Sequence, residues 1–239
     1  MKLNHLKTYL ILVLIITTNT IKAQDNLFGG GFGGGTFSMN STKELNQVIS
    51  SGLPFKAELT TNFPPYFFYK AEVLHCFTKN FALGVNLSST STCSRLSYAD
   101  YSGSYKLDNV QNGLFAGIKI LNGEAPGEVT GFNLGLEGGV AFSKMKIDET
   151  MKAFDQTTSD NTKVSSMGFY VQPGVYYFIV PKSQFRFSAN VSYYFGIEKG
   201  YHLPDKKDAV LTNPDTGKPV KPQWDGVRIG VTAYWVLRK

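Results

Sequence analysis

Apolar and polar residues alternate with a period of two along much of this chain. In Phe132–Ser143, the even positions are phenylalanine, leucine, valine and one glycine, and the odd positions are small or polar. Successive side chains of a β-strand point to opposite faces, so the pattern predicts strands with one apolar and one polar face. Eight such strands are predicted: Gly30–Met39, Phe67–Phe77, Phe81–Ser91, Val110–Ile120, Phe132–Ser143, Phe169–Ile179, Phe185–Glu198 and Val227–Leu237.

The predicted strands are long and their connections alternate in length. A typical soluble strand has about 5–6 residues, whereas a membrane-spanning strand needs about 9–11. Long connections are expected at Asn40–Pro65, with a short helix capped by Ser41 or Thr42, at Glu149–Thr162 and at Lys199–Gln223. Short connections are expected at Thr78–Asn80, Asn122–Glu128 and Pro181–Ser183, and the connection at Asp100–Ser104 is short although it lies on the long-loop side. Long loops at one end and short turns at the other are typical of outer-membrane barrels. We therefore expect an all-β, transmembrane, antiparallel up-and-down β-barrel of about eight strands.

The N-terminus has the features of a secretory signal peptide. Met1–Lys7 carries two lysines, Tyr9–Ile16 is apolar, and Ala23 places a small residue before Gln24. This order of basic, apolar and small residues is typical of a cleaved export signal, and the apolar stretch is shorter than the roughly 20 residues of a spanning helix. We expect a signal peptide at residues 1–23 and a barrel domain at residues 24–239.

Composition adds little beyond this. The formal net charge of +6 includes Lys2, Lys7 and Lys22, so the mature chain would carry only +3. No run of lysine or arginine resembles a nucleic-acid footprint, so no nucleic-acid partner is expected. Aromatic residues make up 14% of the chain and glycines number 24, as strands and tight bends require.

The two cysteines are predicted to lie far apart. Pairing Phe77 with Phe81 across a three-residue turn places Cys76 opposite Ala82 and moves Cys93 about ten residues away along the strands. That separation is roughly 33 Å, whereas a disulfide requires Cα atoms within about 7 Å. We expect two thiols.

Charged residues on the predicted polar faces are the main candidate site. They are Lys70, Glu72, Lys119, Glu137, Arg186, Glu198 and Arg228. An eight-stranded barrel is just wide enough for side chains to fill, and buried charges need partners. We expect a structural network of salt bridges inside the barrel, centred on Glu137, with a gated or narrow solute path as the alternative.

Aromatic residues gather near the predicted strand ends. Phe77, Phe81, Phe185 and Trp235 fall at the short-turn end, and Tyr66, Phe67, Phe68, Tyr98, Tyr101, Tyr105, Tyr193, Phe195 and Trp224 at the long-loop end. Two girdles at the lipid–water interfaces explain this. The alternative is an ordinary aromatic core in a soluble barrel.

No cofactor, metal or catalytic residue is expected. Gly29-x-Gly31-x-x-Gly34 formally matches a dinucleotide fingerprint, but that motif must follow a strand and open a helix, and here a β pattern follows. His5 leaves with the signal peptide, and His75 and His202 are predicted at opposite ends, which disfavours a metal cluster.

Several features together resemble the OmpA/OmpX-like family of eight-stranded outer-membrane β-barrels. They are Ala23-Gln24, the glycine-rich opening Phe28–Phe37, the helix-bearing first loop and the aromatic-rich last strand. The resemblance implies an outer-membrane location, membrane lipid and the barrel-assembly machinery as partners, and a non-enzymatic role in envelope integrity or surface interaction through the long loops. One departure is the ending Trp235-Val236-Leu237-Arg238-Lys239, because such barrels usually finish on an aromatic residue.

Three alternative functions make distinct predictions. A soluble lipocalin-like carrier requires an apolar interior and a polar exterior. A lipid-modifying enzyme requires a serine, a histidine and an acid together at one rim. A narrow channel requires conductance that depends on Glu137 or Arg228.

Overall fold

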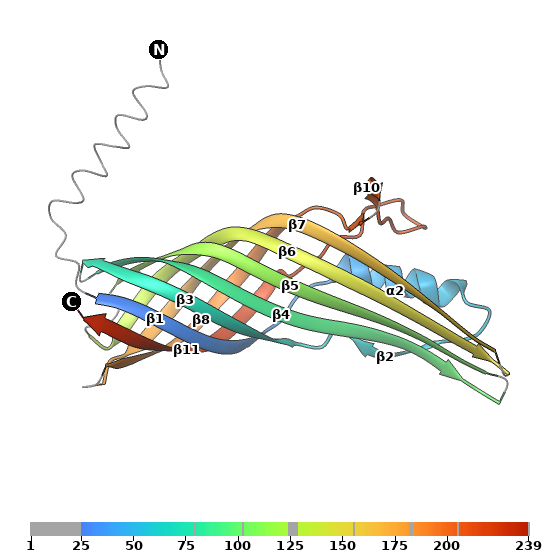
Figure 1. Cartoon of the computed structure of the whole chain (residues 1–239), viewed down its shortest axis with the longest axis horizontal. Helices are drawn as coiled ribbons and strands as arrows, with labels where there is room; N and C mark the ends of the chain where they lie inside the picture. The colour runs from blue at the N-terminus through green and yellow to red at the C-terminus, as the bar shows by residue number, and fades with distance from the viewer. Residues whose placement is uncertain are drawn as a thin grey trace, which may run out of the picture.

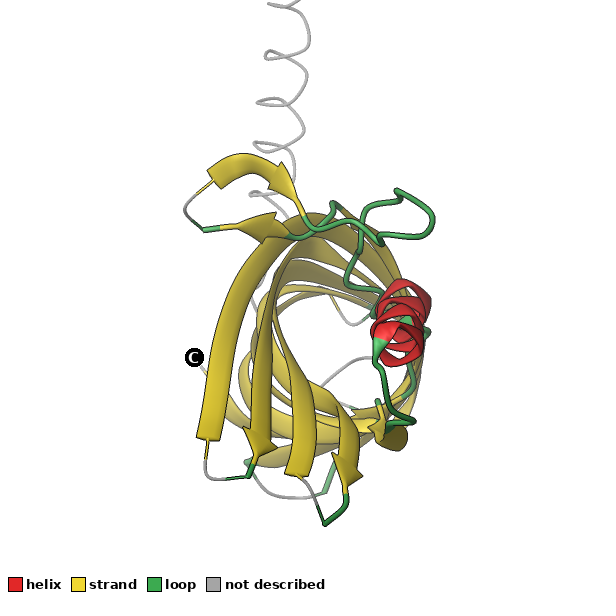
Figure 2. Cartoon of the chain, turned by 90° about the vertical axis from the view of Figure 1, so that its right-hand side faces the viewer, coloured by secondary structure: helices red, strands yellow, loops and turns green. Residues whose placement is uncertain are grey.

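Eight long strands form a closed antiparallel ring in the computed structural model (Figures 1 and 2). The structure describes residues 25–78, 80–101, 103–123, 129–154, 156–181, 184–204 and 206–238. The expected signal peptide and parts of the short connections lie outside these residues. The strands of the ring are β1 (Asp25–Gly35), β3 (Tyr66–Thr78), β4 (Phe81–Ala99), β5 (Gly103–Gly123), β6 (Gly131–Ala153), β7 (Gln156–Ile179), β8 (Phe185–Glu198) and β11 (Gly226–Arg238).

Each of these strands pairs with the next one in sequence, and the last pairs with the first. The β1–β11 register runs from Asp25 opposite Arg238 to Gly35 opposite Arg228, which closes the sheet and leaves no edge over that length. The predicted fold class, an up-and-down antiparallel barrel of eight strands, is confirmed.

The alternating pattern places the apolar residues outside the ring. Every strand of the ring carries at least one large apolar residue that is more than half exposed. These residues are Phe32, Phe67, Val85, Ile118, Leu134, Phe169, Phe195 and Ile229. We call the ring of such outward apolar residues the apolar belt. A lipocalin-like carrier requires the reverse arrangement, because its apolar face lines a ligand cavity and its polar face meets water.

The first strand begins and ends earlier than predicted. β1 covers Asp25–Gly35, whereas the sequence pattern placed it at Gly30–Met39, and the Gly29-x-Gly31-x-x-Gly34 motif lies wholly within it. A Cβ atom added to Gly33 would lie 2.2 Å from the carbonyl oxygen of Ile229 and 2.5 Å from Cζ of Phe68. Glycine is therefore required here so that neighbouring strands and an inward ring can approach closely.

The connection predicted at Glu149–Thr162 is a hairpin, not a loop. β6 and β7 remain paired up to Ala153 opposite Gln156, and β4 and β5 remain paired up to Ala99 opposite Ser104. The segment is polar, and this polarity favoured a loop. Its β-branched residues still favour extended structure, and pairing continues beyond the apolar belt. Both hairpins project from one end of the barrel, which we call the hairpin end (Figure 1).

The remaining elements belong to two long connections at the hairpin end. α2 (Asn40–Gly52) and β2 (Glu58–Asn62) join β1 to β3, and β2 pairs with β4. β9 (His202–Leu203) and β10 (Lys206–Val210) lie between β8 and β11. Among the described residues, no helix is both long and apolar enough to cross a bilayer.

The predicted helix cap is wrong. The N-cap residue is Met39, in a left-handed conformation with φ 46°, and no side chain caps the helix. Ser41 and Thr42 bond elsewhere: Ser41 Oγ donates to the carbonyl of Lys221 at 2.9 Å, and Thr42 Oγ1 accepts from Gln111 Nε2 at 2.9 Å. These two hydroxyls therefore fix the helix to other parts of the barrel.

The β3–β4 hairpin has the predicted register up to its last pair. Cys76 lies opposite Ala82 as expected, but Thr78 rather than Phe77 pairs with Phe81, with a β-bulge between Cys76 and Thr78. Hairpins favour two-residue connections, and a bulge absorbs the extra residue. The prediction of two thiols is confirmed, because neither cysteine forms a disulfide; Cys76 is buried and Cys93 is exposed.

Candidate functional site: the barrel lumen

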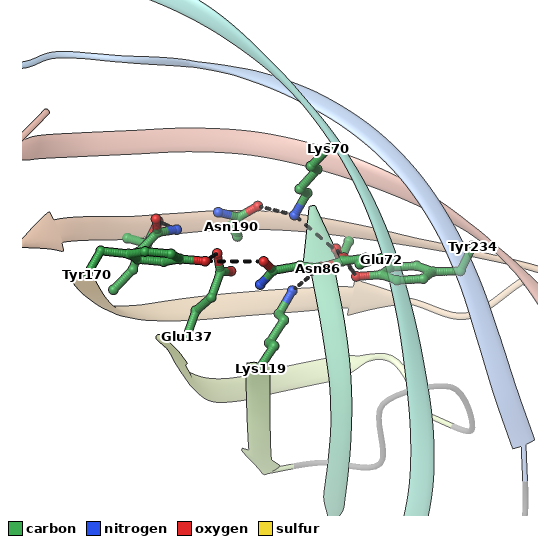
Figure 3. Close-up of polar contacts among 11 residues, drawn as sticks. Lys70, Glu72, Asn86, Lys119, Glu137, Tyr170, Asn190 and Tyr234 are labelled. Atoms are coloured by element: carbon green, nitrogen blue, oxygen red, sulfur yellow. Dashed lines mark hydrogen bonds and ion pairs between the residues drawn. The ribbon is translucent and has the colours of Figure 1, made fainter. Parts of the chain in front are cut away.

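A buried charge cluster in the lumen is centred on Glu72 of β3. Lys119 Nζ, from β5, lies 2.8 Å from Glu72 Oε2, and Lys70 Nζ lies 3.5 Å from Oε1. Tyr234 of β11 donates a hydrogen bond to the same carboxylate (Figure 3). Lys119 also lies over the ring of Tyr176, 4.1 Å from its centroid. Four strands thus contribute to one largely desolvated cluster, in which each charge depends on its partners.

Glu137, the predicted centre of the network, lies beside this cluster rather than at its centre. It sits directly opposite Lys119 in the β5–β6 register. Its carboxylate accepts a hydrogen bond from Tyr170 Oη at 3.1 Å, and that hydroxyl is also 3.2 Å from Asn86 Oδ1 (Figure 3). Glu72 takes the central place because both Lys70 and Lys119 reach it.

Arg228 is held mainly by aromatic rings. Its Nε donates to Tyr66 Oη at 2.8 Å, and its Nη1 donates to Gln172 Oε1 at 3.2 Å. The guanidinium carbon lies 4.1 Å from the ring centroid of Tyr194 and 4.6 Å from that of Phe115. Cation–π contacts strengthen when desolvated, so this side chain is stabilised by ring faces and neutral oxygens rather than by the predicted salt bridge.

The other two predicted charges lie apart from the cluster. Arg186 is at the short-turn end, where its Nη1 donates to the carbonyls of Phe185 at 2.9 Å and Pro181 at 3.4 Å. Glu198 is buried at the last position of β8 and accepts from Tyr194 Oη at 3.4 Å. Of the seven predicted lumen charges, the structure gathers Lys70, Glu72, Lys119 and Glu137, and distributes the rest along the lumen.

Two apolar layers enclose the charge cluster. The short-turn layer contains Leu27, Leu74, Cys76, Ala82, Leu121, Tyr176, Phe178, Tyr234 and Val236. The second layer, toward the hairpin end, contains Met39, Phe63, Tyr66, Phe68, Phe115, Ala141, Tyr170, Tyr194 and Trp224. The rings of Tyr170 and Tyr194 stack at 5.2 Å, and Trp224 meets Phe115 edge-on at 6.0 Å. These side chains fill the interior that an eight-stranded ring encloses.

Some predicted girdle residues therefore belong to the lumen. Tyr66 is only 3% exposed and Trp224 is fully buried, and Phe68 and Tyr105 are buried as well. Adjacent residues on a strand face opposite sides, so Tyr66 cannot share the lipid-facing side with Phe67. The remaining predicted girdle residues are outward or at the rims. Phe81, Phe185, Trp235, Phe67, Tyr193 and Phe195 are exposed, Phe77 packs against His75, Tyr98 stacks on Phe55, and Tyr101 lies exposed in a hairpin turn.

α2 and the last connection pack against the inner wall at the hairpin end. Asn46 Nδ2 donates to Ser94 Oγ at 2.7 Å, which joins the helix to the inner wall (Figure 2). Tyr201 Oη donates to Gln111 Oε1 at 2.9 Å, and Trp224 Nε1 donates to Ser143 Oγ at 2.9 Å. The connection is thereby fixed to the same wall.

Four lumen tyrosines were not among the predicted site residues. Tyr170, Tyr176, Tyr194 and Tyr234 supply most of the ring contacts and hydrogen bonds described above. The alternation that places Arg186 and Arg228 inside also places Tyr194 and Tyr234 inside. They were not named as site residues because only the charged residues of the polar faces were considered.

The requirements of a lipid-modifying enzyme are met only in part at the hairpin-end rim. His202 of β9 pairs in register with Ser165 of β7. The carboxylates described nearby have other partners: Asp148 binds Lys146 at 2.7 Å, and Glu198 is buried against Tyr194. His75 is at the opposite end, with Nδ1 2.8 Å from Asn26 Oδ1.

Comparison with known proteins gives similarity of fold only. No family model and no curated protein matches this chain. Its structure is similar to that of Ail, the attachment invasion locus protein of Yersinia pestis, at 14% identity over 90% of this chain and 99% of the other, with a TM-score of 0.36. The outer membrane protein OprG from Pseudomonas aeruginosa is 14% identical over 90% of this chain and 94% of the other, with a TM-score of 0.39. The N-terminal beta-barrel domain of OprF from the same organism is 12% identical over 90% of this chain and 100% of the other, with a TM-score of 0.30. The eight-stranded closure itself is established by the strand pairing of this chain.

Proposed function

We propose that this chain is a non-enzymatic outer-membrane barrel that does not conduct solutes and that acts through the surface at its hairpin end. The observation that carries the proposal is the filled lumen. A desolvated ion cluster lies between two layers of buried aromatic and aliphatic side chains, and α2 packs against the inner wall at the hairpin end.

The dimensions of the apolar belt support insertion in a membrane. On β6 the outward apolar residues run from Phe132 to Phe142, which is roughly 33 Å of strand. At a strand tilt of about 40°, this length spans roughly 25 Å, the height of the apolar band in outer-membrane barrels. Membrane lipid is then the partner of the belt, and the assembly machinery for such barrels is the partner during insertion.

The hairpin end supplies the surface for interaction. β7 continues from Met167, the last outward apolar residue, to Gln156, a distance on the order of 35 Å along the strand. Together with β4, β5 and β6 it forms a sheet beyond the belt, with a buried apolar cluster on one face. Recognition residues are often carried on such segments above a stable scaffold.

Conductance in planar bilayers tests the closed lumen. The folded chain is expected to give no channel steps at neutral pH in simple salt, whereas Trp224→Ala is expected to raise the frequency of openings because it removes a fully buried side chain from the lumen. Regular steps from the unmodified chain, lost in Glu137→Gln or Arg228→Gln, would establish the narrow channel instead.

A further inference from the structure

Lysines gather on the outward face of the barrel immediately beyond the apolar belt. Lys144 and Lys146 are on β6, Lys163 is on β7 and Lys199 follows β8. We call these four residues the basic patch. Lys144, Lys163 and Lys199 are exposed, and Lys146 is partly exposed.

The strand register concentrates these charges. Lys146 lies directly opposite Lys163, and Lys144 lies opposite Ser165, in the β6–β7 pairing. Like charges directly opposite each other destabilise a sheet. Within the described part of the chain, Asp148 is the one acid that pairs with the patch, at 2.7 Å from Lys146 Nζ. The patch therefore keeps an excess of positive charge, and the repulsion between the lysines destabilises the sheet without a benefit to the fold.

On the adjacent strands at the same end, both cations have a carboxylate partner. On the outward face of β4 and β5, Arg95 Nε lies 2.5 Å from Asp108 Oδ1, and Lys106 Nζ lies 2.8 Å from Oδ2 of the same carboxylate. The excess charge is thus a local property of β6, β7 and the start of the last connection.

The patch also contains surface hollows. One, of about 360 Å³, has Phe142, Lys144, Ser165, Met167 and Lys199 in its lining. A second, of about 340 Å³, has Lys144, Lys146, Lys163 and Ser165 in its lining. Both include Lys144 and Ser165, so they adjoin each other. The first combines apolar residues of the belt with cationic residues of the patch.

The position of the patch matches the level of lipid headgroups. Lys144 follows the exposed Phe142 by two residues on the same face, and Lys199 follows the exposed Ile197 by two residues. Two residues of strand correspond to about 7 Å. A cationic side chain at this height lies where the apolar region ends and the headgroups begin, and each such side chain attracts anionic lipid.

We propose that the basic patch binds the phosphate-bearing headgroup of a membrane lipid in the leaflet at the hairpin end. Lys144 and Lys163 contact the phosphate groups, Ser165 offers a neutral hydrogen-bonding group between them, and the acyl chains lie against Phe142 and Met167. This inference rests on the proposed insertion of the belt in a membrane.

Native mass spectrometry of the folded full-length mature chain in a neutral detergent tests the proposal. The probe is diphosphorylated lipid A, and phosphatidylcholine is the comparison lipid without net charge. Each lysine near an anionic surface contributes about fivefold in affinity. The K144Q/K163Q variant is therefore expected to bind lipid A roughly 10- to 30-fold more weakly and phosphatidylcholine unchanged.

A matched control removes the same charge elsewhere at the hairpin end. K56Q/K152Q changes two exposed lysines outside the patch and is expected to bind lipid A like the unmodified chain. Equal loss in both variants would show a general charge effect and would overturn the proposal, as would unchanged binding in K144Q/K163Q.

Two further readouts separate the remaining outcomes. Millimolar inorganic phosphate is expected to leave lipid A binding intact; full displacement by phosphate would assign the patch to a soluble anion and overturn the lipid assignment. Heat-modifiability of each variant reports folding. A barrel that is found outside the outer membrane contradicts the proposed function, whereas a correctly inserted barrel with no patch-dependent lipid binding contradicts only this inference.

Discussion

Replacing Glu72 by glutamine removes the anion from the centre of the lumen cluster while preserving the shape of the side chain. Glu72 is buried, and its two oxygens lie 2.8 Å and 3.5 Å from the ammonium groups of Lys119 and Lys70. The substitution leaves two buried cations beside each other without their central carboxylate. Removing one partner of a buried ion pair costs about 3–5 kcal/mol, so we expect a loss of that size in the free energy of unfolding.

A surface pair provides the matched control. Lys106 Nζ lies 2.8 Å from Asp108, but its side chain is 50% exposed and that of Asp108 is 20% exposed. Exposed pairs contribute about 0–1 kcal/mol, so Lys106→Gln is expected to be nearly neutral. The double variant Glu72→Gln/Lys119→Gln removes one cation together with the anion, and it should be more stable than Glu72→Gln alone because the uncompensated charge is smaller.

The free energies can be measured by urea unfolding of the barrel refolded into lipid vesicles, followed by tryptophan fluorescence and heat-modifiability. A loss of less than about 1 kcal/mol in the free energy of unfolding of Glu72→Gln would be the loss expected for an exposed ion pair. Glu72 would then not be the centre of a desolvated cluster.

Three further predictions follow from the same structure. Trp224→Ala should cost about 3–5 kcal/mol of stability because it opens a cavity in the fully buried aromatic layer, and the same urea titration measures it. Gly33→Ala should impair refolding because its Cβ would meet a carbonyl at 2.2 Å, whereas Gly30→Ala, with no atom within 4 Å, should refold normally; equal refolding yields would contradict the close approach. A membrane-impermeant maleimide added to intact cells should label the exposed Cys93 and leave the buried Cys76 unmodified. The reverse pattern, or no labelling of Cys93, would contradict a hairpin end that faces outward.

The architecture could be predicted from the sequence because each strand of a barrel wall has one face toward lipid and one toward the interior. Apolar and polar residues therefore alternate along the strand. Phe185–Glu198 was predicted with the bounds that β8 has, and its odd positions face outward as expected. The same rule failed where both faces are polar. Residues 149–162 lack an apolar face, so nothing in their pattern distinguished a paired hairpin from a loop, and the pairing became apparent only from the neighbouring strands.

The sequence predicted which charged residues face the lumen, but not which of them contact each other. Parity places Lys70, Glu72, Lys119 and Glu137 inside, as the structure has them. Which acid takes the centre depends on how strands far apart in sequence align across the lumen, and Lys119 reaches Glu72 from 47 residues away. Arg228 shows a second limit, because the rings that hold it come from β3, β5 and β8, and no local pattern pairs them.

The proposed function requires the apolar belt to be embedded in the outer membrane. Electrophoretic heat-modifiability of the mature chain, combined with fractionation of the cell envelope, measures this directly. We predict a form that migrates anomalously until boiled and that is recovered with the outer membrane. A periplasmic protein that stays in solution without detergent would contradict the account, because so large an apolar exterior cannot remain exposed to water.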